Sequence, residues 1–574
     1  MKFLSSLACA VVLALIATSA AIAQAPNNTY VISDLHFGIG APPNPGFKAP
    51  AGLPCDLPGV VLPPLNDPKW LETEDFRWPV ALCGFLTQIA NQPAGAELVI
   101  AGDFLELWQH PQKQCILAAN PECGCTVEEM EEITARVIAA HAQEFAMLDR
   151  YLQGNTKNTL VVVPGNHDAA LMHDRIWALV RNAMPSAGTR LLRADSGTWI
   201  SADMQLVVEH GHQQHVPDVN AFPDWDKRKV TQQCGEGAKE RFYAPWGENF
   251  VSNLYTAIEY SLFPLIDNLV PDSAGLGVYF AETKLRGITA REAARFIYFN
   301  VFETSFRQKE QVLAVNDRPN GQLSDIEVEA CVQCIGDVEL VLRDARRNEQ
   351  LAKLLGEQAL AGTPEFAAAM AEERNKMPGQ RLPKAHQRLL CEREGAADVG
   401  MKGKGIPLDA NGAACPGILS TAAAKLFDQD GAQMLQERIE SLRTPTDDGI
   451  TTYVFGHTHE AKRRMDVRLI SRTVGAFNTG AFHRQIDQAH FKSHPNRKPG
   501  ESDPDFLKRM THGDLAACYS VVAVTYKKRN SGKYERVADL KHWYQDETSA
   551  QGQFIDACDA RCSAKPANCP GAGS

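Results

Sequence analysis

Five short segments of the sequence carry side chains that are typical of metal-dependent chemistry. Asp34 and His36 stand two positions apart at the end of an apolar run, so an extended backbone places both side chains on one face. That geometry suits a metal. Similar side chains follow four later apolar runs, in the segments Gly102-Asp103, Gly165-Asn166-His167-Asp168, His210-Gly211-His212 and Gly456-His457-Thr458-His459.

The apolar runs that precede these segments predict buried strands, because they are short and bounded by Gly or Pro. They cover residues 30–33, 97–101, 160–163, 205–209 and 452–455. In an open α/β sheet the carboxyl ends of the strands face one shared crevice, so we expect the five segments to converge there. The glycines before Asp103, Asn166 and His457 allow tight turns and close approach of the backbone.

Helical patterns separate the first three strands, at about residues 70–91 and 126–153. The second helix has an N-cap at Thr126, a capping-box partner at Glu129 and Gly154 beyond its end. Further strands are expected at 467–472, 474–477 and 519–526. Strands that alternate with helices predict a layered α/β fold.

The ordered segments resemble the signature of the calcineurin-like metallophosphoesterase superfamily. That signature runs D-x-H, G-D-x-x-D, G-N-H-[DE], H-G-H and G-H-x-H, and five corresponding segments occur here in the same order, within residues 29–215 and 450–482. The resemblance implies a phosphoesterase sheet core with helices on its faces. One position departs from the pattern, since Glu106 stands where the family usually has Asp. This change concerns the surroundings of the site and the subfamily, because the preceding Asp103 is unaffected.

The resemblance also implies a site with two metal ions that share Asp103. One ion would be held by Asp34, His36, Asp103 and His459, and the other by Asp103, Asn166, His210 and His457. This mixture of carboxylate, amide and imidazole favours divalent or trivalent Mn, Fe, Zn or Co over Ca. His167 would face the scissile phosphate without binding metal, and Asp168 would orient its ring.

The reaction that the resemblance implies is hydrolysis of a phosphate mono- or diester by attack of a metal-bound hydroxide. The substrate would be a small-molecule or lipid-like phosphate ester. Two alternatives stay open: a pyrophosphatase acting on a nucleotide- or lipid-linked diphosphate, and a binding protein that retains the metals without turnover. The stretch "GDFLELW" resembles the UDP-diacylglucosamine pyrophosphatase branch, although export argues against its cytoplasmic substrate.

The chain divides into five expected regions. Residues 1–23 read as a secretory signal, with Lys2 before a short apolar stretch and small residues at its end, so we expect periplasmic or secreted protein. The phosphoesterase core would cover residues 24–215 and 450–545. Residues 216–449 would form a mostly helical insertion or cap without alternating strands, and residues 546–574 a Cys-containing tail.

Composition limits the partners and the redox state of the protein. The chain has 574 residues with 58 basic and 69 acidic side chains, so bulk attraction to nucleic acid is not expected. No segment after the signal is apolar enough to span a membrane, and oligomeric state is not evident. Of 15 cysteines, only Cys9 lies in the signal. The remaining even number predicts disulfides rather than metal binding at Cys123, Cys125, Cys331 and Cys334.

Several polar residues near the five segments have two interpretations each. His212 and His215 are either close to the metals or substrate, or hydrogen-bonded loop histidines. The basic run at residues 462–464, as well as His483 and Arg484, either receives an acidic group or is a charged surface. Residues 250–270 are apolar and predict a buried helix broken near Pro264, with a greasy substrate entrance as the alternative.

Overall fold

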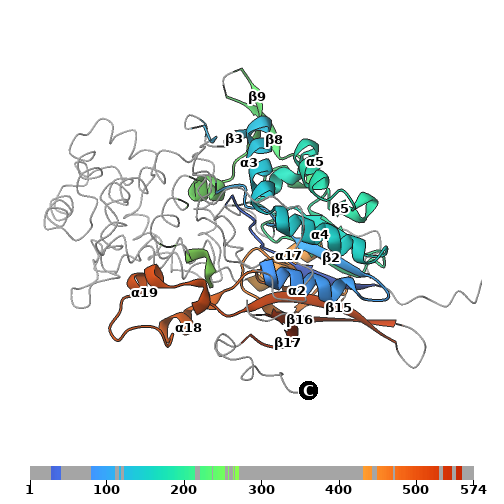
Figure 1. Ribbon diagram of the computed structural model, residues 1–574. Helices are drawn as coiled ribbons and strands as arrows, with labels where there is room; N and C mark the ends of the chain where they lie inside the picture. The colour runs from blue at the N-terminus through green and yellow to red at the C-terminus, as the bar shows by residue number, and fades with distance from the viewer. Residues whose placement is uncertain are drawn as a thin grey trace, which may run out of the picture.

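The structure, a computed structural model, is a mixed α/β fold with several sheets (Figure 1). It describes residues 27–39, 79–109, 122–213, most of 220–252, 265–270, 431–442, 449–528 except 470–471, 534–545 and 551–558, with isolated positions such as Cys115 between them. The expected signal and residues 271–430 of the expected insertion lie outside this part. No described helix is long and apolar enough to cross a bilayer.

The larger sheet has seven strands in the order β17-β16-β15-β1-β2-β4-β5. Strands β1, β2, β4 and β5 are parallel, and β15 joins β1 in the antiparallel sense. The strands are β1 (Asn28–Ile32), β2 (Ala96–Ala101), β4 (Thr159–Val163), β5 (Leu191–Arg193), β15 (Cys518–Lys528), β16 (Tyr534–Tyr544) and β17 (Gln553–Ile555). Strand β17 belongs to the expected tail, and the Cys518–Cys558 disulfide fastens the tail to β15.

A second sheet of five strands has the order β12-β13-β11-β7-β6. Its members are β6 (Thr198–Ile200), β7 (Leu206–Glu209), β11 (Thr452–Phe455), β12 (Lys462–Arg468) and β13 (Thr473–Asn478). The five strands that lead to the polar segments therefore do not share one open sheet, because β7 and β11 pair with each other rather than with β1, β2 or β4. The strand expected at 467–472 lies earlier, as the edge strand β12, and carries the exposed basic run 462–464.

Alternation of side chains along the central strands divides the core into layers. In β2, Leu98 and Ile100 pack against helices, whereas Val99 and Ala101 pack against the second sheet. The helices on the first side are α2 (Pro79–Ala90), α3 (Val127–Ala140), α4 (Ala142–Gly154) and α5 (Asp174–Ala183). Helix α17 (Gly431–Ser441) covers the outer face of the second sheet. The order is thus helices, seven-stranded sheet, five-stranded sheet, helix.

The long helix expected at 126–153 is two helices that meet at His141. The expected capping box at its start is confirmed, because Thr126 accepts from the Glu129 amide and Glu129 accepts from the Thr126 amide. Gly154 is the last residue of α4 rather than a position beyond it. Helix α2 accounts for the described end of the helix expected at 70–91.

A disulfide-linked unit projects from the core at the top of Figure 1. Strands β3 (Cys123–Thr126), β8 (Thr231–Cys234) and β9 (Lys239–Tyr243) form its antiparallel sheet. Disulfides join Cys115 to Cys125 and Cys123 to Cys234, so these cysteines offer no thiolate to a metal, as expected. The expectation that residues 216–449 lack alternating strands is wrong at β8 and β9, since the hairpin completes a sheet with β3.

Candidate metal centre

The chemistry-bearing segments meet where five strands from both sheets end. Strands β1, β2 and β4 of the seven-stranded sheet lead to the segments at residues 34, 103 and 166. Strands β7 and β11 of the five-stranded sheet lead to those at 210 and 457. Two backbone hydrogen bonds tie these ends together: the Asp34 amide donates to Gly102 O at 3.1 Å, and the Gly456 amide donates to His210 O at 2.8 Å.

One group of possible ligands consists of Asp34, His36 and His459. The Nε2 atoms of His36 and His459 lie 3.1 Å apart, and His459 Nε2 is 3.4 Å from Asp34 Oδ1. Asp34 and His36 are almost completely buried, and the side chain of His459 is 10% exposed. Three ligand atoms therefore point toward a common position, as the sequence predicts for one metal ion.

A second group contains Asp103, His210 and His457. His210 Nε2 lies 3.0 Å from Asp103 Oδ2 and 2.9 Å from the side-chain oxygen of Asn166. Asp103 also faces the first group, because its Oδ2 is 3.8 Å from His36 Nε2. The structure thus brings all seven expected ligand residues together and places Asp103 between the two groups.

The backbone at this site adopts a conformation that L-residues rarely take. Five residues of the two groups have positive φ angles between 46° and 72°, namely Asp34, His36, Asp103, His457 and His459. Only three other described non-glycine residues share this property. A left-handed conformation costs free energy at such residues, and strain of this kind concentrates at functional sites. The backbone therefore indicates a site whose geometry is maintained at the expense of local stability.

Glycines allow the close approach of the ligand side chains. A Cβ atom on Gly102 would lie 2.2 Å from the His210 ring, and one on Gly165 would lie 2.2 Å from Asp103 Oδ1. Both distances are shorter than the contacts that Cβ atoms make with non-bonded neighbours, so a larger residue would displace a ligand side chain. The expectation that these glycines permit close backbone approach is confirmed.

Charges of opposite sign shift the pKa values of the buried groups. Burial raises the pKa of Asp103, but His210 and His167 outweigh it and hold that pKa well below its usual range. Burial lowers the pKa of His210, yet Asp103 and Asp34 raise it to about 9. Two buried carboxylates surrounded by imidazoles are costly unless cations compensate them. The donor set fits transition metals, and these His/Asp groups could hold metal ions.

Glu106, which departs from the family pattern, has a larger part in the site than the sequence indicated. Its Oε2 lies 3.0 Å from His36 Nδ1 and 2.5 Å from His167 Nδ1. Its Oε1 accepts from the backbone amides of Trp108 and Gln109. Burial raises the pKa of Glu106, but the charge of His167 and the bonds from both histidines bring it to about 2. One carboxylate thus orients an expected ligand and the expected catalytic histidine.

His167 lies beside the two groups and belongs to neither expected ligand set, although it forms a third group of possible ligands with His36 and Asp103. Its ring stacks on Trp108 with centroids 4.0 Å apart, and its side chain is 16% exposed. Burial lowers the His167 pKa, but the charges of Glu106 and Asp103 raise it to about 9. The two carboxylates therefore favour the protonated form of this imidazole.

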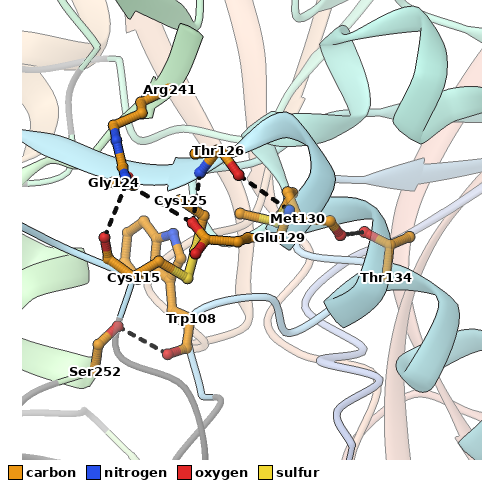
Figure 2. Close-up of a disulfide and its surroundings, with 10 residues drawn as sticks. All are labelled: Trp108, Cys115, Gly124, Cys125, Thr126, Glu129, Met130, Thr134, Arg241 and Ser252. Atoms are coloured by element: carbon orange, nitrogen blue, oxygen red, sulfur yellow. Dashed lines mark hydrogen bonds and ion pairs between the residues drawn. A yellow bond between two sulfur atoms is a disulfide. The ribbon is translucent and has the colours of Figure 1, made fainter. Parts of the chain in front are cut away.

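The loop that holds Glu106 and Trp108 is fastened by residue 252, and the disulfide-linked unit lies nearby (Figure 2). Ser252 Oγ donates to the Trp108 carbonyl at 2.8 Å, and Arg241 donates to the carbonyl of Cys115 at 3.2 Å. Figure 2 shows Trp108 beside the Cys115–Cys125 disulfide.

Asp168 does not orient the His167 ring, so that expectation is wrong. Its carboxylate accepts from the backbone amides of Gly165, Phe104 and Leu105, which binds two of the strand-end loops together. The pKa of Asp168 is raised to about 7 by burial and by the charge of Asp103. The carboxylate that contacts His167 is instead that of Glu106. The two residues are 61 positions apart, so no local sequence pattern reveals their pairing.

His210 and His212 have different surroundings although they are two residues apart. His210 Nδ1 donates to the Ala101 carbonyl at 2.9 Å, which directs Nε2 toward Asp103. His212 is buried with its ring edge against Trp225, and neither of its nitrogens has a hydrogen-bond partner among the described residues. Burial and the charges of its histidine neighbours lower its pKa well below the usual value. His215 lies outside the described residues.

Comparison with protein-family models, with curated proteins and with solved structures found no match to this chain.

Proposed function

We propose that the chain is an exported phosphoesterase with a dinuclear metal centre and a calcineurin-like sheet core. The single observation that carries this proposal is the meeting of two His/Asp groups around Asp103, with the imidazole of His167 held beside them by Glu106. A purely structural metal site has no need of a partly exposed, carboxylate-oriented histidine outside the expected ligand set.

Two ions of Mn, Fe, Zn or Co would be held by the residues of the two groups. Asp34, His36 and His459 would hold one, Asn166, His210 and His457 the other, and Asp103 both. When bound, such a pair of ions lowers the pKa of a coordinated water and stabilises charge on phosphoryl oxygens.

The protein's own contribution to the reaction would be made by Glu106 and His167. Glu106 fixes the ring of His167 through Nδ1, so Nε2 is the nitrogen that would carry a proton toward the leaving oxygen. Trp108 covers one face of the ring and limits its rotation and its access to water. A general acid matters most when the leaving group is a poor one, such as an alkoxide.

The substrate class that we propose is a small-molecule or lipid-like phosphate mono- or diester. A nucleotide- or lipid-linked pyrophosphate would use the same ligands and the same proton carrier, and would differ only in contacts beyond the phosphate. Export to the periplasm or the medium is supported by three disulfides that join pairs of described residues, since disulfides persist in oxidising compartments.

The test combines a metal count with a hydrolysis assay. Protein purified without chelators should contain about two transition-metal ions per chain, and it should hydrolyse nitrophenyl phosphate mono- or diesters after supplementation with Mn, Fe or Zn. Chelation should abolish turnover, and returning the metal should restore it. Full metal occupancy without turnover on any ester would favour the non-catalytic binding protein instead.

A further inference from the structure

A segment of the expected insertion is fastened next to the proposed metal centre by two short strands. Strand β10 (Leu269–Val270) pairs in parallel with β14 (Ile486–Asp487). A short 3-10 helix, Ile266–Asn268, precedes β10, and the segment before β14 contains His483. This pairing holds Asn268 against His483, although 215 positions separate them in the chain.

His483 connects this segment to the first ligand group. Its ring lies 5.5 Å from that of His459, with the two rings nearly perpendicular. Asn268 Nδ2 donates to the Arg484 carbonyl at 2.8 Å and lies 3.3 Å from His483 Nδ1. Because the Arg484 carbonyl can only accept, the Asn268 atom that faces it is the nitrogen, and the other end of the side-chain amide is Oδ1. Asn268 and His483 are each only 1% exposed.

Three buried polar atoms of this region lack hydrogen-bond partners among the described residues. They are Asn268 Oδ1, His483 Nε2 and Gln109 Oε1. Gln109 connects this region to Glu106. Its backbone amide donates to Glu106 Oε1, and its side-chain Nε2 donates to Asp267 at 3.3 Å. Buried polar atoms are nearly always satisfied in folded proteins, so these three atoms need partners that the described residues do not provide, and a bound substrate is one source of such partners.

We infer that Asn268, His483 and Gln109 bind the hydroxyl groups of a polyhydroxylated leaving group, so that the substrate is a sugar or polyol phosphate. This inference rests on the proposed function. The two amide oxygens require hydrogen-bond donors, and the imidazole nitrogen either donates or accepts. Hydroxyl groups provide both. An acyl chain or an unsubstituted ring would leave all three atoms unsatisfied, and a site built to bond hydroxyls discriminates strongly against such analogues.

The experiment compares phosphate esters that differ in their hydroxyl groups. The probes are inositol 1-phosphate, glucose 1-phosphate and glycerol 1-phosphate, with cyclohexyl phosphate as the matched ester that lacks hydroxyls. We expect the wild-type kcat/KM to be at least about tenfold higher for one of the polyol phosphates than for cyclohexyl phosphate. In Asn268→Ala this ratio should fall by about tenfold, with the greater part of the loss in KM.

Paired substitutions at His483 separate hydrogen bonding from packing. His483→Gln retains a polar atom near the position of Nε2, whereas His483→Asn retains one only near Nδ1. We expect the preference for polyol phosphates to persist in part in His483→Gln and to be lost in His483→Asn, with the metal content equal in both.

Asn158→Ala provides the control for a buried amide with a structural function. Asn158 bonds the backbone at Ala96, Ala90 and Tyr151, near the start of β2 and therefore at the opposite end of that strand from Asp103. Its substitution should lower stability without changing the substrate ratio.

Equal losses on polyol and cyclohexyl phosphates in Asn268→Ala would overturn the inference, and so would a wild-type enzyme without any polyol preference. These results would leave the proposed function intact provided that nitrophenyl phosphate is hydrolysed. A wild-type protein that hydrolyses no ester at all would instead overturn the proposed function, together with the inference that rests on it.

Discussion

The two ligand groups of the candidate metal centre are supported by different kinds of contact. In the first group, the Glu106 side chain bonds His36 Nδ1, and the same carboxylate oxygen holds His167. In the second group, His210 Nδ1 donates to a backbone carbonyl. The neighbouring His212 packs against aromatic rings and has no polar partner among the described residues.

Because of this difference, substitutions near the first ligand group (the first side) and near the second ligand group (the second side) should have different effects on metal binding and turnover. The first side couples metal binding to the proton carrier, because one carboxylate serves both histidines. The second side depends on the backbone, which side-chain substitutions leave in place. Substitution of Glu106 should therefore lower metal affinity and turnover together, whereas side-chain substitutions around the second group, such as those at His212, should have little effect.

Asp103 belongs to both groups, so its substitution should have the largest effect. Asp103→Asn removes the negative charge shared by His36 and His210, and we expect loss of metal from both positions with a fall in kcat of about a thousandfold or more. Metal analysis of the purified variant measures the first effect. Asp34→Asn is the matched variant, because Asp34 lies in the first group alone and its loss should spare one ion. Full occupancy in Asp103→Asn would contradict the shared position.

His167→Ala should retain both ions and lose turnover. Loss of a general acid costs about 10²- to 10⁴-fold in rate, and we expect losses in this range on alkyl phosphates. The loss on nitrophenyl phosphates should be much smaller, because that leaving group departs without a proton. The measurement is kcat on both esters together with the metal content. Wild-type rates on the alkyl ester would remove His167 from the reaction.

Glu106→Gln tests the coupling that distinguishes the first side. Partners of this kind typically change metal affinity or activity by about 10- to 100-fold, and here we expect losses of both. Glu106→Asp restores the residue typical of the resembled family and should recover a part of the activity if the carboxylate reaches His167. Asp168→Asn is the control, since that carboxylate bonds only backbone amides in the described contacts. A Glu106→Gln variant with lowered turnover and unchanged metal affinity would show that the two functions are separable.

The residues at the strand ends could be predicted from the sequence because local rules govern them. A short apolar run and a metal-ligand residue lie next to each other in the chain, with a glycine between them in three of the five segments, and all five runs form strands in the structure. The clash that a Cβ on Gly102 or Gly165 would cause gives the physical reason for those glycines.

Contacts between distant segments could not be predicted in this way. The periodicity of β7 and β11 identifies strands but does not say which sheet they join, so the second sheet was missed. The pairing of Glu106 with His167 and the position of Asn268 beside His483 are tertiary contacts without a local signal. Asp168 was misassigned because adjacency in sequence suggested contact with His167, whereas its carboxylate turns toward the backbone.

The smallest effect should follow substitution of His212 on the second side. His212→Phe replaces a buried imidazole without polar partners by a ring of similar shape, so no described hydrogen bond is lost and aromatic contact with Trp225 remains. We expect the free energy of unfolding to stay within about 1 kcal/mol of wild type and kcat to change less than about threefold. Denaturant titration and steady-state kinetics measure both. A tenfold loss of activity with metal depletion would mean that His212 supports the ions, and the second side would then depend on side chains as the first does. His212→Asn would identify the cause, because a polar substitute that restores activity implies a hydrogen bond, whereas recovery only with aromatic residues implies packing.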